Sequence, residues 1–216
     1  MSTSWRGRKE PTAGELLLVN WVLVLLRGIP VAIVVFGGLI LHTVLRIFEY
    51  PFLGSRRPLT QYVTQVVCKT SLFLLGISIT VEGFPMKERG AVVANHSSWL
   101  DIFALNATQK IYFVAKSEVA NWPGIGWLAR ATGTVFIQRK ALQAHKQKNI
   151  FTERLLAGHK LLFFPEGTST DSLRVLPFKS SLFAAFFETN VPRNLFIQPV
   201  TLSLIHISEP TRLRSI

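Results

Sequence analysis

The stretch "ANHSSWLD", residues 94–101, places a histidine and an aspartate five positions apart at the end of an apolar run. This separation is about 500° on a helical wheel, so His96 and Asp101 would not share a face if both were helical. They can meet if His96 lies in a turn and Asp101 in the first turn of a following helix, for which Ser97 and Ser98 are candidate N-caps. A carboxylate that holds one imidazole nitrogen leaves the other free as a base. The pair therefore predicts a dyad that removes a proton from a substrate hydroxyl. An aspartate that caps the helix, beside a histidine packed in the core, would produce the same sequence pattern and is the alternative.

The chain around this pair has the pattern of a parallel sheet. Short apolar runs end in polar residues or glycine, and helical segments such as 99–107 and 140–157 separate several of them. This alternation is typical of an α/β domain with a mostly parallel central sheet flanked by helices. Functional side chains gather at the carboxyl ends of such strands, and His96, Arg139 and Glu166 each lie at or just past the end of an expected strand. The expected strands are 77–83, 90–95, 111–116, 133–139, 160–167 and 195–202.

Four motifs follow one another in this part of the chain. They are N-H-x4-D at 95–101, "GTVFIQR" at 133–139, "FFPEGTST" at 163–170 and "IQPV" at 197–200. In this order they resemble the motifs of the glycerolipid acyltransferase family, and most closely those of bacterial lysophosphatidic acid (1-acylglycerol-3-phosphate) acyltransferases. The resemblance covers residues 78–201, which is essentially all of the chain outside its apolar N-terminal part.

The resemblance implies the transfer of an acyl group between two bound substrates. In the family, the position of His96 is the general base that activates the free hydroxyl of a lysophospholipid, and that of Asp101 orients and charge-stabilises the imidazole. The hydroxyl attacks the thioester of acyl-CoA or of acyl-carrier protein, and proximity of the two substrates supplies much of the rate. No metal or organic cofactor is implied.

The same resemblance implies a phosphate site at Arg139 and at the loop Glu166-Gly167-Thr168. Guanidinium and backbone N–H groups suit a phosphate, and Gly167 lets the backbone come close to it. Glu166 cannot bind an anion, so we expect it to hold Arg139 or a backbone turn.

One position departs from the family pattern, because Ser169 stands where the family usually has an arginine. Arg174, Lys179 and Lys116 are candidates to replace the missing cation. The leading hypothesis for the reaction is acylation of 1-acylglycerol-3-phosphate to phosphatidic acid. A lyso-ornithine lipid or another lysophospholipid is an alternative acceptor, and a lipid-binding membrane scaffold without catalysis is the non-enzymatic alternative.

The N-terminal part, residues 1–58, is expected to be a membrane-associated helical segment. Residues 16–45 carry a single charge, Arg27, and the part from Gly28 to Leu45 carries none, which is about the minimum for a spanning helix. Pro30 is expected to kink the segment or to separate two helices. The segment is therefore either one tilted span or a hairpin in one leaflet, with Arg27 reaching the headgroups.

The composition favours a membrane partner. The chain has 49% hydrophobic residues, and its net charge of +12 comes from 24 Lys and Arg against 12 Asp and Glu, which indicates an anionic partner such as a membrane surface. No basic block with interleaved aromatic residues occurs, so nucleic acid is not expected. The single cysteine, Cys68, excludes an internal disulfide framework. The predicted location is the bacterial inner membrane, with the catalytic domain in the cytoplasm.

The remaining boundaries divide the chain at residue 201. Residues 59–201 are expected to form the acyltransferase domain, which begins with a partly buried helix at 59–76 and is truncated at its C-terminus. The stretch "LSLIHISEPTR" at 202–212 resembles a translated sequencing-library adapter. Residues 202–216 are therefore expected to be a non-native tail.

Overall fold

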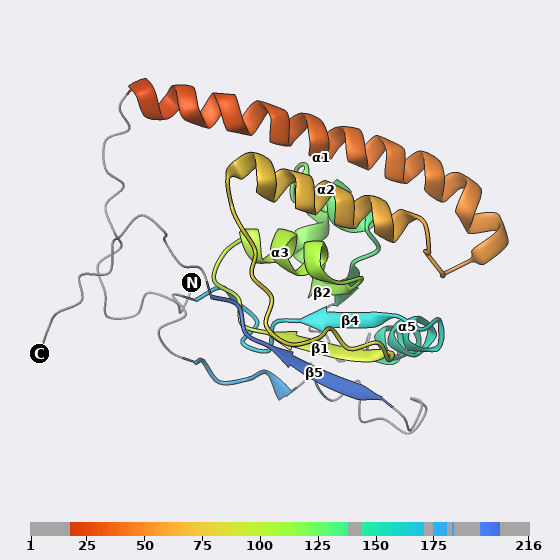
Figure 1. Ribbon diagram of the computed structural model, residues 1–216. Coiled ribbons are helices and arrows are strands. Elements are labelled where there is room, and N and C mark those ends of the chain that lie inside the picture. Colours follow the sequence, from red (N-terminus) through yellow and green to blue (C-terminus); the bar gives the residue numbers. More distant parts are fainter. Residues whose placement is uncertain (1–17, 138–143, 171–174, 181–182, 184–194, 204–216) are drawn as a thin grey trace, which may run out of the picture.

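Five short strands form one sheet at the centre of the structure, a computed structural model that describes residues 18–137, 144–170, 175–180, 183 and 195–203 (Figure 1). The order across the sheet is β3-β2-β4-β1-β5, and every neighbouring pair is parallel. The predicted α/β fold with a parallel central sheet is thus confirmed. The strands are β1 (Gly90–Ala94), β2 (Tyr112–Lys116), β3 (Val135–Ile137), β4 (Lys160–Phe163) and β5 (Phe196–Val200).

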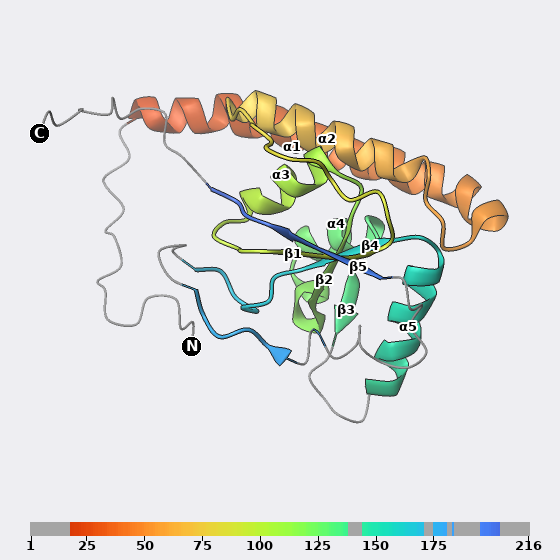
Figure 2. The ribbon, with the colours of Figure 1, turned by 60° about the horizontal axis from the view of Figure 1, so that its bottom comes forward.

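Helices connect the strands and cover both faces of the sheet, as parallel pairing requires. One face packs against Phe151 and Leu155, and the other packs against Leu105. In the central strand β4, Leu161, Leu162 and Phe163 are each at most 1% exposed, which explains why its sequence is apolar without alternation. Figure 2 shows the sheet between these layers. The connecting helices are α3 (Leu100–Thr108), the 3-10 helix η1 (Ser117–Asn121), α4 (Ile125–Ala131) and α5 (Ala144–Leu156).

Two further helices, α1 (Leu18–Leu53) and α2 (Thr60–Leu75), form a hairpin above α3 (Figure 1). The helices approach closely at Gly38, where a Cβ atom would lie 2.3 Å from Val67 Cγ2. Cys68 and Leu72 of α2 pack with Ala107 of α3. Helix α2 is therefore the layer between α1 and the sheet domain.

The expectation that Pro30 separates two helices is wrong, because α1 continues through this residue. An interior proline removes one helical hydrogen bond and costs about 3 kcal/mol. Contacts with α2 on both sides of Pro30 oppose this cost: Arg27 Nη1 donates to the Leu75 carbonyl at 3.1 Å, and Gly38 packs on Val67. The hairpin turn falls instead at residues 54–59, and Arg27 binds the end of α2.

The segment 77–83, expected to be a strand, joins no sheet. It runs from the end of α2 toward β1, and most of its residues are exposed. A side chain of β5 holds the residues that follow it: Gln198 Oε1 accepts from Met86 N at 2.9 Å, and Gln198 Nε2 donates to the Phe84 carbonyl at 2.8 Å. The β-branched residues of this segment are typical of a strand. The chain is held here by two hydrogen bonds from the Gln198 side chain and not by backbone pairing.

Candidate active site

The turn between β1 and α3 is fixed by contacts with two distant parts of the chain. Asn95 donates from Nδ2 to the Leu202 carbonyl at 2.9 Å and accepts from Leu202 N at 2.7 Å. On the other side, Thr170 N donates to the His96 carbonyl at 2.8 Å. Because β1 and β4 are neighbours in the sheet, the loops that follow them lie side by side. Leu202, assigned to the tail from the sequence, therefore contributes to positioning this turn.

His96 and Asp101 are in contact within this turn. The imidazole Nδ1 lies 2.8 Å from Asp101 Oδ2. The same oxygen accepts from Ser97 N at 2.7 Å and from Ser98 N at 2.9 Å. A carboxylate can only accept, so Nδ1 carries the proton and donates it. In the neutral ring, Nε2 then has a free lone pair, which is the form that a general base needs.

The carboxyl group of Asp101 stays ionised although it is only 1% exposed. Burial by itself raises its pKa, but the hydrogen bonds from His96 and from the backbone N–H groups of Ser98 and Ser97 lower it by more, and the resulting pKa lies below the usual value. The ionised carboxylate lies 2.8 Å from the ring, where it can stabilise the imidazolium that forms during proton transfer. The pair can therefore accept a proton at Nε2 and hold the resulting positive charge.

Asp101 also stabilises the start of α3. It lies in the first turn and reaches back to Ser98 N, while Ser98 Oγ accepts from Leu100 N at 3.3 Å. This exchange resembles a capping box, except that Ser98 Oγ accepts from Leu100 N while Asp101 N bonds the Ser98 carbonyl at 3.1 Å. One carboxylate thus makes both the contact with the start of α3 and the contact with the imidazole, and proton removal by the pair stays a prediction.

The imidazole ring rests on an aromatic side chain that the motif analysis missed. The rings of His96 and Phe164 stack with their centroids 4.1 Å apart and their planes at 12°. The His96 side chain remains 17% exposed, against 1% for Asp101. Phe164 directly follows β4. Its position in "FFPEG" was the only feature of the sequence that pointed to a place near the site. The stacking fixes the plane of the ring and leaves Nε2 without a hydrogen-bond partner among the described residues.

The loop after β4 is a turn that Glu166 fixes from inside. Glu166 is 5% exposed, and its Oε2 accepts from Leu176 N at 3.0 Å. Gly167 has φ of +69° and donates its N–H to the Phe164 carbonyl at 2.9 Å, a conformation that favours glycine. The expectation that Glu166 holds a backbone turn agrees with this contact.

The cations expected around the site are only partly described. Lys179 donates its backbone N–H to the Pro165 carbonyl at 2.8 Å, and its side chain is exposed. Lys116 ends β2 and is also exposed. Arg139 and Arg174 lie outside the described residues. The end of β3 at Ile137 is on the same edge of the sheet, three strand spacings or about 14 Å from β1. Thr168 is half-buried, and the binding roles expected for these residues stay predictions.

Comparison with known proteins identifies similar sequences. Residues 78–203 match the Acyltransferase family. A lyso-ornithine lipid O-acyltransferase from Rhodobacter capsulatus is 51% identical over 199 residues, which are 92% of this chain and 72% of that protein. A protein of the same name from Rhizobium meliloti is 36% identical over 86% of this chain and 63% of its own length. A 1-acyl-sn-glycerol-3-phosphate acyltransferase from Neisseria gonorrhoeae is 40% identical over 53% of this chain and 46% of its own length.

A solved structure has the same fold. The 1-acyl-sn-glycerophosphate acyltransferase from Thermotoga maritima superposes with a TM-score of 0.57 and 22% identity, over 85% of this chain and 83% of that one. The chain spans between 46% and 72% of the length of the three relatives named above.

Proposed function

The chain belongs to the Acyltransferase family, and from this premise we propose that it acylates the free hydroxyl of a lyso-ornithine lipid with His96 as the general base. Nε2 of His96 takes the hydroxyl proton while the oxygen attacks the thioester carbonyl. The tetrahedral intermediate collapses, the carbon–sulfur bond breaks, and the imidazolium returns the proton to the thiolate. The observation that carries this proposal is the 2.8 Å contact between His96 Nδ1 and the buried Asp101 carboxylate.

A phosphate-free acceptor agrees with two observations. The relatives from Rhodobacter capsulatus and Rhizobium meliloti both carry the name lyso-ornithine lipid O-acyltransferase. In this chain Ser169 replaces the arginine usual after Glu-Gly-Thr, and its side chain is exposed beside the Glu166 turn. An ornithine headgroup bears a carboxylate and an ammonium group. Such a headgroup needs fewer cations than a phosphate monoester, which carries close to two negative charges.

The second candidate acceptor is 1-acylglycerol-3-phosphate. The relative from Neisseria gonorrhoeae has this activity in its name and is 40% identical over 119 residues. The chemistry at His96 is the same for both acceptors, since each presents a free hydroxyl beside an acyl chain. The two candidates therefore differ only in the groups that hold the headgroup.

We further propose that α1 lies along a membrane surface with the catalytic domain on the cytoplasmic side. Within the described part of the chain, α1 is the one helix long and apolar enough to cross a bilayer. Its 36 residues extend about 54 Å, well beyond the roughly 30 Å of a hydrocarbon core. Large apolar side chains are exposed along its whole length, from Trp21 to Phe52. A helix in the plane of one leaflet can bury apolar side chains along its whole length, whereas an upright helix leaves about 24 Å of it outside the hydrocarbon core.

The acceptor panel is the experiment that tests this function. The purified chain in detergent is given an acyl thioester and either a lyso-ornithine lipid or 1-acylglycerol-3-phosphate, and the released thiol and the lipid product are measured. We expect a higher kcat/KM with the lyso-ornithine lipid. The variant His96→Ala serves as the control for spontaneous thioester hydrolysis. A higher kcat/KM with the phosphate acceptor would assign the second candidate instead, and no thiol release with either would leave the scaffold hypothesis.

A further inference from the structure

The corner between η1 and α4 carries three large apolar side chains that proton transfer at His96 does not use. Trp122, Ile125 and Trp127 are 53%, 49% and 60% exposed. None of them belongs to a hydrophobic core cluster of the described residues. Large apolar side chains gathered at one exposed place mark a contact with a membrane or with another molecule. We name residues 122–127 the tryptophan corner.

The backbone of the tryptophan corner keeps these side chains on the outside. A Cβ atom on Gly126 would lie 2.2 Å from the Ala120 carbonyl oxygen, so η1 and α4 meet backbone against backbone. Gly126 N donates to the Trp122 carbonyl at 2.8 Å, and Gly124 turns the chain with φ of +71°. Because no side chain fits between the two helices at Gly126, the tryptophans on either side of it face outward.

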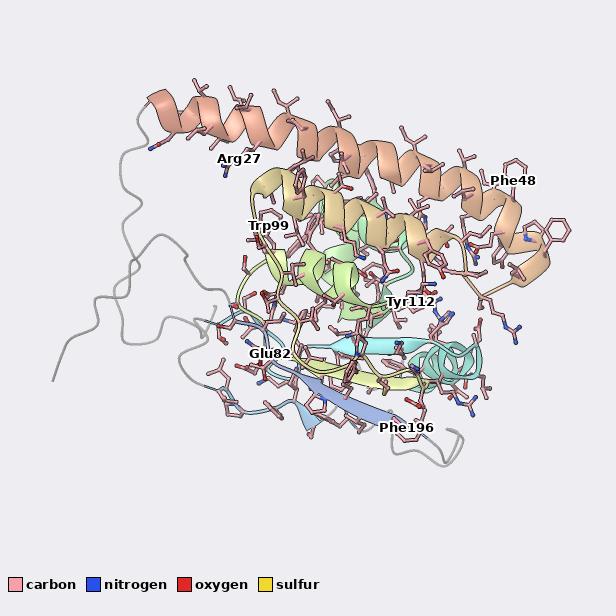
Figure 3. All side chains as sticks on the ribbon, in the orientation of Figure 1. Arg27, Phe48, Glu82, Trp99, Tyr112 and Phe196 are labelled. Carbon is pink, nitrogen blue, oxygen red and sulfur yellow. The ribbon has the colours of Figure 1, made fainter. Side chains whose placement is uncertain are left out.

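The tryptophan corner touches α1, which is proposed above to lie along the membrane. A Cβ atom on Gly124 would lie 3.9 Å from Phe36 Cζ of α1. Phe36 is itself 43% exposed. Farther along the same helix, Phe48 projects away from the sheet (Figure 3). The exposed apolar surface of α1 therefore continues without interruption onto the corner.

The corner and α2 lie on opposite flanks of α1. Val35 is buried and marks the side of α1 that faces the protein. At about 100° per residue, Phe36 lies about 100° to one side of Val35 and Gly38 about 60° to the other. Gly38 packs on Val67 of α2, whereas Phe36 is next to the corner. A bilayer that covers the outward face of α1 therefore meets the corner at the edge of that face.

The residues around the corner suit lipid headgroups. Lys116 precedes η1 and Arg130 is in the last turn of α4, and both are exposed. One exposed acid, Glu118, lies between them. Tryptophan collects where hydrocarbon meets headgroups, and basic side chains beside it contact lipid phosphates. A bilayer fits the corner better than a protein partner does, because the adjoining face of α1 already requires hydrocarbon.

The corner is also connected to the catalytic edge of the sheet. Helix η1 begins directly after β2 ends, on the edge where β1 leads into His96. Only β4 separates β2 from β1, so the two strand ends are about 10 Å apart. The acceptor and the product of the proposed reaction are both lipids and must pass between the bilayer and this edge.

We propose that the tryptophan corner inserts into the headgroup region of the leaflet that holds α1, as a second membrane contact that keeps the catalytic edge at the bilayer. Trp122 and Trp127 lie at the boundary between headgroups and hydrocarbon, and Lys116 and Arg130 contact lipid phosphates. This contact rests on the membrane position proposed for α1. It is independent of which acceptor is acylated.

Spin labelling of the full chain in mixed phosphatidylglycerol and phosphatidylcholine vesicles tests the corner. A nitroxide is attached to Trp122→Cys or Trp127→Cys, and its collision rates with oxygen, which concentrates in lipid, and with a water-soluble nickel chelate are measured. Phe196→Cys is the matched control, because Phe196 is 51% exposed and lies on β5, far from α1 (Figure 3). Phe48→Cys reports the position of α1. The native chain, whose single cysteine Cys68 is buried, gives the background.

We expect oxygen collisions to dominate at positions 48, 122 and 127 and nickel collisions to dominate at position 196. Nickel collisions at 122 and 127, with oxygen collisions at 48, would overturn the corner and leave α1 on the membrane. Low rates with both reagents at 122 and 127 would mean that protein covers the corner, which also overturns the proposal. Oxygen collisions at 122 and 127 but not at 48 would support the corner and contradict the position proposed for α1.

A double variant tests whether the corner matters for turnover. Trp122→Gln combined with Trp127→Gln should lower kcat/KM about tenfold with acceptor presented in vesicles, because two apolar side chains no longer enter the bilayer. With a short-chain acceptor dissolved in water, kcat/KM should not change. Both side chains are exposed, so the unfolding midpoint should stay that of the wild type. An equal loss with both acceptors would mean that the tryptophans act on catalysis or folding and would contradict the membrane contact.

Discussion

Replacing Asp101 by asparagine separates the charge of this side chain from its hydrogen bonds. Oδ2 accepts from His96, Ser97 and Ser98, whereas Oδ1 is buried without a partner among the described residues. The amide oxygen of Asp101→Asn should therefore take the place of Oδ2, because an NH₂ group there would face three donors. The His96 tautomer is then retained, and the main loss is the negative charge that stabilises the imidazolium.

The size of this loss follows from the geometry. Two charges about 4 Å apart near a protein surface interact by about 4 kcal/mol, and a neutral hydrogen bond retains part of that. A loss of about 3 kcal/mol lowers kcat about a hundredfold. The new NH₂ group has no acceptor, so the folded state should also lose about 2 kcal/mol. This stability difference is present above the unfolded-state carboxyl pKa of about 4 and shrinks as the pH falls below it, because the pKa of Asp101 in the folded state is lower still.

The assay is thiol release by purified Asp101→Asn at neutral pH, with wild type and His96→Ala in parallel. The matched control is Glu118→Gln, which makes the same change at an exposed acid in the first turn of η1 and should retain full activity. Full activity of Asp101→Asn would mean that the carboxylate only caps α3. A loss as complete as that of His96→Ala would mean that the hydrogen-bond assignment at Oδ2 is wrong.

Three further predictions concern other parts of the structure. Ser169→Arg should raise the kcat/KM for 1-acylglycerol-3-phosphate relative to lyso-ornithine lipid about tenfold. An unchanged ratio would mean that residue 169 does not contact the acceptor headgroup. Gly133→Ala should lower the Tm by about 5 °C, because φ is +82° and the new Cβ meets Arg57. Gly158→Ala has the same strain at φ of +83° with open space around it and should lower the Tm less; equal shifts would exclude the clash. Burial raises the pKa of Cys68 to about 12, so a thiol reagent at pH 8 should label it only after denaturation, and rapid labelling of the native chain would contradict its burial.

Much of the fold could be predicted because buried parallel strands leave a clear pattern. A strand covered on both faces is a continuous apolar run, as in "KLLF" of β4. The contact between His96 and Asp101 could be predicted from helix geometry, since only a turn followed by a helix brings positions five apart together. These features depend on neighbours in the sequence.

The features that could not be predicted depend on distant residues. The strand expected at 77–83 has residue types that favour a strand, but the Gln198 side chain of β5 forms hydrogen bonds with the residues after it. The break expected at Pro30 is absent because α2 packs against α1 on both sides of it. The stacking of His96 on Phe164 joins loops that meet only because β1 and β4 are neighbours. Local spacing carries no information on any of these contacts.

The central claim is that His96 removes the acceptor proton, and the activity of His96→Ala tests it most directly. The variant loses the stacking on Phe164 and the hydrogen bond to the buried Asp101 carboxylate, so its Tm should fall by a few degrees while the chain still folds. With a lyso-ornithine lipid and an acyl thioester, its kcat should fall about a thousandfold, as the loss of a general base predicts. Turnover near the wild-type rate by the folded variant would contradict the account.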